Sequence, residues 1–270
     1  MLFADRIIFV EGLAEQILLP CIASYEEIEE ETTKEDLLIN KHVSIISVDS
    51  RTFKHFLILF GYNETSNNYA IGKKVVCITD ADPMIKKGNR WHATYPFLLD
   101  GSDESKNLSS HVFELNDKFQ SLYPNIKICH PDAGKGKTFE YELAKYNPTS
   151  RLLITNSFTS QSSPHSIKNY LELVKKYNSP LDELINEYSL KLGTEVENDE
   201  VVNGIKNCNW DENEKKNAFF AAIYLRSISK SKGENSLFLE KKLRDNLKVR
   251  KPRPFVIPNY IKDAISFVLD

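Results

Sequence analysis

Two acidic residues follow directly on an apolar run in the first third of the chain. Asp80 comes immediately after Val75–Thr79, a run that is rich in β-branched residues, and Asp82 follows two residues later. Two carboxylates this close repel each other, and both ionise only when a cation neutralises them. Carboxylate oxygens are the ligands that Mg²⁺ and Mn²⁺ prefer. The pattern predicts a divalent-metal site, and an Asp-rich turn is the alternative interpretation.

A second acidic pair lies near the start of the chain. Glu11 ends the apolar run Ile7–Val10, and Gly12 then allows a tight turn into the next segment. If a helix begins after Gly12, Glu15 lies about one turn along it and can help Glu11 surround a cation. The alternative is a plain helix start, where the macrodipole favours acidic residues.

The elements that must position these acids form a recognisable pattern. Short apolar runs alternate with segments of helical spacing, which predicts an α/β sheet with parallel strands. Ligands bind such sheets at the carboxyl ends of the strands, and the acids lie there. The predicted strands are Ile7–Val10, Val43–Val48, Val75–Thr79, Ile126–Cys129 and Leu152–Thr155, and the predicted helices between them are Leu13–Ser24 and Phe53–Phe60.

The second half of the chain has a different pattern. From about residue 163 onward the apolar residues recur at helical spacing. The predicted helices are His165–Tyr177, Leu181–Leu192, Asp211–Ser229 and Leu237–Leu247. We therefore expect an α/β catalytic domain over residues 1–157 and a mostly helical lobe over residues 158–270, with the Lys232 region and the C-terminal helix packing back on the first domain.

Charge is segregated along the chain. The 270 residues carry a net charge of −3, so any attraction to a polyanion must be local. Residues 26–36 hold seven acids and one lysine, which we interpret as a solvated helix end and loop. Residues 230–253 hold nine bases and three acids, and their densest part contains Arg250, Lys251 and Arg253. This stretch can contact a DNA backbone, and a solvated helix and tail is the alternative.

Several features limit where the protein works. The composition, 41% hydrophobic and 27% charged, is that of a globular protein. The four cysteines are scattered without CxxC spacing, which argues against a zinc knuckle or a disulfide scaffold. The apolar runs are too short to span a bilayer, and the first residues lack the order of a signal peptide. We expect a cytoplasmic protein that has reduced thiols and does not bind membranes.

These motifs together resemble a known catalytic domain. A glutamate within Val-Glu-Gly at residues 10–12, followed by Asp-Ala-Asp at residues 80–82, resembles the Toprim domain of topoisomerases, primases and certain nucleases. Residues 3–20 are similar to the opening of the Toprim region of OLD-family (overcoming lysogenization defect) ATP-dependent endonucleases, and Glu15 favours that branch. Segments 45–48, 138–144, 232–233 and 255–262 agree with this family in the same order.

The resemblance implies a fold, an activity and roles for individual residues. It implies a Toprim-type parallel sheet flanked by helices, with an added helical lobe, acting as a two-metal DNA endonuclease or nickase with Mg²⁺ or Mn²⁺. By this resemblance Glu11, Asp80 and Asp82 hold one metal and the attacking water, Glu15 and Glu140 help hold a second, and Lys232 neutralises transition-state charge. Because nearby segments depart from the family pattern, Glu142 and Lys230 stay open as alternatives to Glu140 and Lys232.

The resemblance also implies partners. DNA is the implied substrate, anti-phage defence the implied role, and an ABC-type ATPase the implied partner. That ATPase normally precedes the Toprim region and is absent from this chain, so we expect either an excised domain or a separate ATPase polypeptide. The competing class is a non-catalytic Toprim-like module that binds Mg²⁺ or a nucleotide and regulates a partner ATPase.

Other motifs carry weaker hypotheses. Gly136-Lys137-Thr138 imitates a P-loop, but Pro131 stands where the first glycine of that motif belongs, which disfavours nucleotide binding. A haloacid-dehalogenase phosphatase has its Asp-x-Asp on the first strand, not the third. The histidines lack paired metal spacing and are expected to be structural or exposed. Trp91 and Trp210 are expected to pack, with base stacking as the alternative for residues 89–92.

Overall fold

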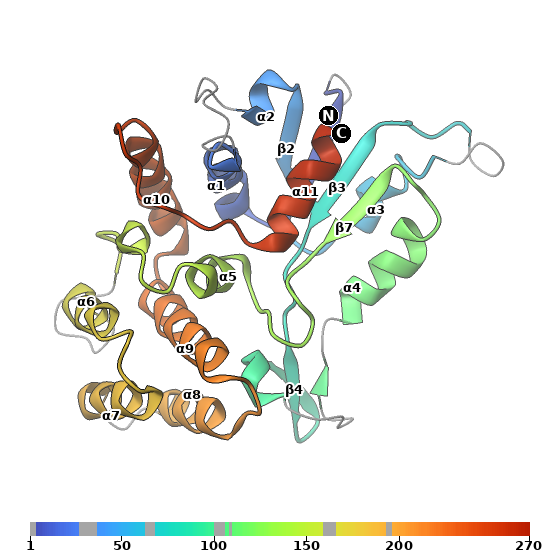
Figure 1. Cartoon of the computed structure of the whole chain (residues 1–270). Coiled ribbons are helices and arrows are strands. Elements are labelled where there is room, and N and C mark those ends of the chain that lie inside the picture. Colours follow the sequence, from blue (N-terminus) through green and yellow to red (C-terminus); the bar gives the residue numbers. More distant parts are fainter. Residues whose placement is uncertain are drawn as a thin grey trace.

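The α/β sheet predicted from the sequence is confirmed. A computed structural model describes residues 4–26, 37–62, 68–99, 106–107, 110–158, 166–192 and 196–270. Four parallel strands lie in the order β2-β1-β3-β7 (Figure 1). Their bounds are β1 (Arg6–Val10), β2 (Val43–Ser47), β3 (Lys74–Ile78) and β7 (Ile126–Cys129). The two central strands are almost wholly buried, which explains their continuous apolar sequences.

Alternate residues of the central strands face two separate cores. Ile8, Val10 and Val76 join a core with helices α1 (Leu13–Ala23) and α11 (Asn259–Leu269). On the other face, Ile7, Phe9 and Cys77 pack with α3 (Lys54–Leu57) and α4 (Ser110–Leu115). The short helix α2 (Leu37–Asn40) contacts both α1 and β2. A period of two residues along each strand thus supplies apolar side chains to both layers.

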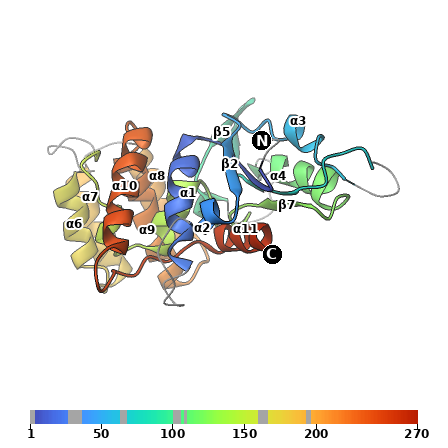
Figure 2. The ribbon, with the colours of Figure 1, turned by 90° about the horizontal axis from the view of Figure 1, so that it is seen from above.

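A group of helices follows the sheet in the sequence. The helices of this part are α5 (Phe139–Tyr146), α6 (Ile167–Lys175), α7 (Leu181–Leu192), α8 (Val196–Asn207), α9 (Glu212–Ser227) and α10 (Lys232–Leu247). Helix α5 packs on α9, α10 packs along α1, and α11 lies on β3 and β7. Figure 2 shows α6 and α7 at one end of the molecule and α3 and α4 toward the other. The last two helices of the chain therefore contact the part that contains the sheet.

Three details of the sequence prediction are wrong or incomplete. The strand predicted over Leu152–Thr155 is instead a short 3-10 helix, η4 (Arg151–Leu153), because a buried apolar run of four residues fits either conformation. Helix α10 begins five residues earlier than predicted, so Lys232 lies in its first turn. Helix α8 was not predicted at all.

A second, small antiparallel sheet was also not predicted. Its strands lie in the order β5-β4-β6, with bounds β4 (Met84–Lys87), β5 (Arg90–Ala93) and β6 (Lys106–Asn107). Gly88, with φ of +63°, makes the turn between β4 and β5. A 3-10 turn, η2 (Pro96–Leu98), and a π-helical turn, η3 (Asn116–Gln120), complete the described elements. Trp91 on β5 is 43% exposed, so its predicted packing role is wrong, whereas Trp210 packs on Phe97.

Some sequence predictions fall on parts of the chain that the structure does not cover. Most of the acidic run, residues 27–36, lies outside the described residues, as do residues 159–163 of the polar stretch 157–163 that marks the predicted domain boundary. All four cysteines are buried. Within the described ranges, no helix is both long enough and apolar enough to cross a bilayer.

Candidate functional site

Glu11 links the ends of the two central strands. Its Oε1 accepts a hydrogen bond from the Thr79 hydroxyl and another, 2.9 Å long, from the backbone N–H of Asp80. Burial raises the pKa of Glu11, although these two hydrogen bonds oppose the rise. The strand-end positions of β1 and β3 thus bring together the two acidic motifs that are 69 residues apart in the sequence.

Glu15 points into the same region from the first turn of α1. It is only 7% exposed, which is unusual for a glutamate. Burial and the charges of Glu140 and Glu11 together raise its pKa to about 7, against the opposing charge of Lys232. The predicted proximity of Glu15 to Glu11 is therefore present in the structure.

Asp80 connects the end of β3 to the start of α5. Its Oδ1 accepts a 2.8 Å hydrogen bond from the backbone N–H of Phe139, the first residue of that helix. Burial raises the pKa of Asp80 well above its usual range, and the charges of Glu11, Glu15 and Glu140 add to this effect. Repulsion from these neighbouring charges thus favours the protonated form of Asp80.

Glu140 and Lys232 complete this group from two further helices. Glu140, 6% exposed in the first turn of α5, pairs with Lys232 in the first turn of α10 at 3.2 Å between Oε2 and Nζ. Burial disfavours the charged form of Lys232, but Glu140 and the other nearby acids raise its pKa overall. We call Glu11, Glu15, Asp80 and Glu140 the acid cluster, with Lys232 at its edge.

The two alternatives left open by the sequence lie elsewhere. Glu142, two residues after Glu140, turns away from the acid cluster and lines a separate cavity. Lys230 is exposed just before α10 begins. The geometry thus groups Glu140 and Lys232, and neither alternative, with the acid cluster.

Asp82 lies at the border of the acid cluster, and its carboxylate pairs with Arg51. Its Oδ2 is 3.4 Å from Nη1 of Arg51, while its charge contributes to the raised pKa of Glu11 and Asp80. Its backbone φ is +44°, in the left-handed region that non-glycine residues rarely adopt. Such strain persists only where the surroundings impose it, and it is frequent at functional sites.

Three residues beside the acid cluster were not expected at this site from the sequence. Arg51 follows the carboxyl end of β2, so the strand-end rule that found the acids could also have found it. His111 Nε2 lies 3.1 Å from the Thr79 hydroxyl, which already contacts Glu11. Lys137 is buried, and its ammonium donates a hydrogen bond to the carbonyl of Thr94.

Lys137 also connects the P-loop-like segment to the loop that follows β3. Its carbonyl accepts hydrogen bonds from the N–H groups of Ala81, at 2.8 Å, and Asp82, at 3.4 Å. Burial lowers the pKa of Lys137 to about 8, although Asp82 and Asp80 oppose this. The lysine that would reach a nucleotide phosphate in a P-loop is instead engaged inside the protein.

The acid cluster has suitable donor chemistry for a divalent cation. Its four carboxylates supply hard oxygen ligands, and burial together with mutual repulsion raises the pKa of three of them. Within the described ranges, however, no three His, Cys, Asp or Glu side chains are arranged closely enough to hold a metal ion. The residues thus fit Mg²⁺ or Mn²⁺ in chemistry, without a preformed coordination geometry.

The predicted DNA-binding residues lie apart from this cluster. Arg250, Lys251 and Arg253 are exposed beyond the end of α10, whereas Lys232 lies at its beginning. At 1.5 Å per residue, the helix between them is about 22 Å long. The structure therefore places Lys232 at the acid cluster and the outer bases at the far end of the same helix.

The first part of the chain matches a known family. Residues 2–82 match the family model described as overcoming lysogenization defect protein-like, TOPRIM domain. The resemblance found in the sequence is thereby confirmed for this segment, which contains Glu11, Glu15, Asp80 and Asp82. Glu140 and Lys232 lie outside the match, and it is the fold that brings them to the same site.

Two solved structures are similar to this chain over nearly its whole length. The C-terminal region of the Burkholderia pseudomallei OLD protein is 17% identical, with 99% of this chain and 98% of that chain covered and a TM-score of 0.47. The C-terminal region of the Xanthomonas campestris pv. campestris OLD protein is 16% identical, with 100% and 97% covered and a TM-score of 0.45. No curated protein gives a significant match.

Proposed function

We propose that this chain is the Toprim nuclease region of an OLD-type protein and cuts or nicks DNA with divalent metal ions. The observation that carries the proposal is the convergence of four carboxylates and one lysine at the carboxyl end of the parallel sheet. The match of residues 2–82 to an OLD-like Toprim domain supports it, because Toprim domains generally bind divalent metals such as Mg²⁺.

Each residue of the site has a proposed role. Glu11, Asp80 and Asp82 would hold one metal and the attacking water, and Glu15 and Glu140 would help hold a second. When bound, two cations activate water and stabilise the leaving oxygen of a phosphodiester. Lys232, held by Glu140 at the edge of the cluster, would neutralise the negative charge that develops on the phosphate.

The wider setting follows from the same family resemblance. We propose that residues 1–157 form the catalytic domain and residues 158–270 a helical lobe, and that the protein works in the cytoplasm in anti-phage defence. DNA would be the substrate, and an ABC-type ATPase domain or subunit would control the activity. A non-catalytic Toprim-like module that binds Mg²⁺ and regulates such an ATPase is the second candidate.

A plasmid assay separates these two candidates. Supercoiled plasmid is incubated with the full chain and either Mg²⁺ or Mn²⁺, alone and with the partner ATPase. We expect nicking or linearisation that falls at least a hundredfold in Asp80→Asn, which keeps the shape of the side chain but removes its charge. Asp117→Asn, at an exposed position, should cut like the unmodified chain. Absence of cutting under every metal and partner condition would favour the regulatory module.

A further inference from the structure

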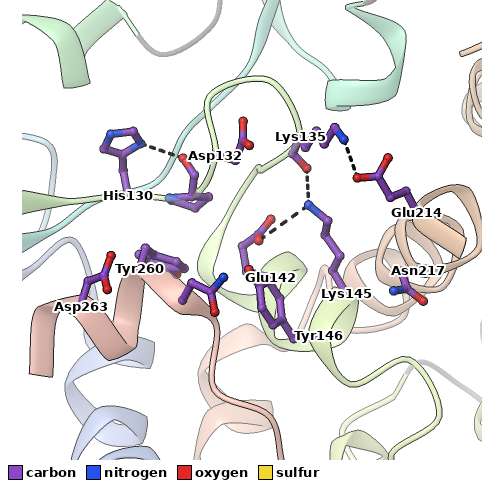
Figure 3. Close-up of a pocket in the computed structure, with 12 residues that line it drawn as sticks. His130, Asp132, Lys135, Glu142, Lys145, Tyr146, Glu214, Asn217, Tyr260 and Asp263 are labelled. Atoms are coloured by element: carbon purple, nitrogen blue, oxygen red, sulfur yellow. Dashed lines mark hydrogen bonds and ion pairs between the residues drawn. The ribbon is translucent and has the colours of Figure 1, made fainter. Parts of the chain in front are cut away.

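A cavity lies between α5, α11 and the loop after β7 (Figure 3). It has a volume of about 560 Å³, within the usual range for small-molecule sites. Glu142 and Tyr146 line it from α5, Tyr260 and Asp263 from α11, and the loop after β7 closes another side. Glu140 and Glu142 are two residues apart, about 200° around the helix, so they lie on different sides of α5.

Two buried oxygen atoms on the wall of this cavity lack hydrogen-bond partners. Among the described residues nothing bonds Oε1 of Glu142, whose residue is 2% exposed, or the hydroxyl of Tyr260, which is 8% exposed. A buried polar atom without a partner destabilises the fold, so each such atom needs an explanation. Both residues line the cavity, so a ligand bound there would explain the two unpaired atoms.

The charged groups around the cavity leave an excess of negative charge. Two lysines and four acidic residues line it: Lys135, Lys145, Asp132, Glu142, Glu214 and Asp263. Both ammonium groups are already engaged, since Lys135 pairs with Glu214, and Lys145 donates to the carbonyl of Lys135 at 2.8 Å. Lys145 Nζ is 3.9 Å from Oε2 of Glu142, a distance too long for a hydrogen bond.

The remaining lining is aromatic. Tyr146 and Tyr260 present ring surfaces beside the carboxylates of Glu142 and Asp263. Aromatic faces attract organic cations, and carboxylates form strong charge-assisted hydrogen bonds with N–H donors. The volume is large for a single inorganic ion but suits a molecule of several non-hydrogen atoms.

We propose that this cavity binds a small organic cation with several N–H groups, such as a primary amine or a guanidinium compound. Glu142 accepts the principal hydrogen bonds, Tyr260 supplies its hydroxyl, and the tyrosine rings cover the apolar part of the ligand. None of the residues that line this cavity belongs to the acid cluster, so the proposal does not depend on the nuclease assignment.

Calorimetric titration of the full chain with agmatine, which carries both an amine and a guanidinium group, tests this proposal. We expect saturable binding that weakens roughly tenfold or more in Glu142→Gln, because a charged hydrogen bond is lost. Tyr260→Phe should weaken binding a few-fold while keeping the fold, since its hydroxyl has no partner in the protein. Glu140→Gln is the matched control on the other side of α5 and should bind agmatine like the unmodified chain.

Three outcomes would overturn the proposal. The first is no binding of agmatine at millimolar concentration, and the second is unchanged binding in both Glu142→Gln and Tyr260→Phe. The third is a loss of binding in Glu140→Gln alone, because that result would assign the cation to the acid cluster. A parallel titration with Mg²⁺ supplies a fourth: Mg²⁺ binding that depends on Glu142 without any agmatine binding would show an inorganic site. If Glu142→Gln fails to fold, Tyr260→Phe decides.

Discussion

Glu15 shows how strongly its surroundings can alter an acidic residue at the start of a helix. An exposed glutamate in a first turn is stabilised by the helix macrodipole and stays ionised at neutral pH. Here burial and the charges of Glu140 and Glu11 raise its pKa to about 7. One lysine, Lys232, cannot neutralise the whole acid cluster, so the protein without a cation holds charge that is costly to keep buried.

This imbalance predicts how stability depends on pH in the metal-free protein. The folded state holds a proton on Glu15 up to pH of about 7, whereas the unfolded chain releases it near the ordinary glutamate pKa of 4.5. The free energy of unfolding should therefore fall as pH rises through this window, by at most about 3 kcal/mol from this residue. Urea unfolding between pH 4.5 and pH 8, with and without Mn²⁺, measures the change.

The variants for this experiment follow from the same reasoning. Glu15→Gln should reduce the loss of stability at high pH, because the amide stays neutral, and Glu183→Gln at an exposed position should not. Mn²⁺ should restore stability at pH 8 in the unmodified chain and less so in Glu15→Gln. Equal pH profiles for all three proteins would contradict the proposed charge imbalance.

A further prediction at the residue scale concerns the first metal. Glu11→Gln and Asp82→Asn should each lower plasmid cutting at least a hundredfold, because each removes a charge from the metal site without changing side-chain shape. Asn tolerates the left-handed backbone that Asp82 adopts, so folding should be kept. Cutting rates and thermal melting are measured together. A variant that cuts at the unmodified rate would remove its residue from the site.

The sequence allowed some of these residues to be found but not others. Glu11 and Asp80 follow buried strands, and the carboxyl ends of parallel strands meet at one edge, so their proximity was predictable. The contacts of Lys137 were not predictable, because they depend on where residues 81–82 and Thr94 lie in three dimensions. His111 was grouped with structural or exposed histidines, since no spacing in the sequence relates it to Thr79.

The strands and helices also divide into those that the local sequence predicts and those that depend on contacts between distant residues. The four parallel strands are apolar and β-branched, so composition alone predicts them. Strands β4 and β5 include exposed lysines and arginine, and among the described strands they pair with each other and with β6, so no buried run marks them. Glu140 and Glu142 both stay open from the sequence because the loop before α5 departs from the family pattern, and the ion pair of Glu140 with Lys232 distinguishes them in the structure.

Helix α10 combines two proposed roles at its two ends. Lys232 in its first turn contacts Glu140, and the exposed bases Arg250 and Lys251 follow its last turn, about 22 Å away. A DNA duplex that follows the helix could contact both ends, since it rises about 3.4 Å for each base pair. The two ends should then affect different steps.

We expect Lys232→Ala to lower the single-turnover cutting rate at saturating DNA, because its charge acts on the transition state. The exposed neighbour Lys230 provides the matched control, and Lys230→Ala should keep the rate. Changing Arg250 and Lys251 to Ala should mainly weaken DNA binding and flatten its salt dependence by roughly one unit of slope per lost contact. If the double change leaves salt-titrated binding as it was, the basic end of α10 is a solvated tail.

The whole molecule depends on helices that return to the sheet from the end of the chain. Helix α10 packs along α1, and α11 covers β3 and β7. A single apolar core contains Ile8 and Val76 from the sheet, Phe219 from α9 and Ile265 from α11. The acid cluster is assembled in the same way, since Lys232 belongs to the helical part and Glu11 to the sheet. Folding of the two parts should therefore be coupled.

A chain that ends at residue 258 tests this coupling. Helix α11 buries Ile261, Ile265 and Val268 against the sheet, and each fully buried aliphatic side chain stabilises the fold by about 1.5–3 kcal/mol. Losing all three removes roughly 5 kcal/mol or more, comparable with the whole stability of an ordinary domain. We expect the shortened chain to lose its cooperative thermal transition, as followed by circular dichroism.

Point variants of α11 test the same contacts in the full chain. Ile265→Ser should lower the melting temperature markedly, and Ser266→Ala, exposed on the same helix, should not. A shortened chain that melts like the full one would show that the sheet folds without α11, and that the helical part reaches the site only as an independent lobe.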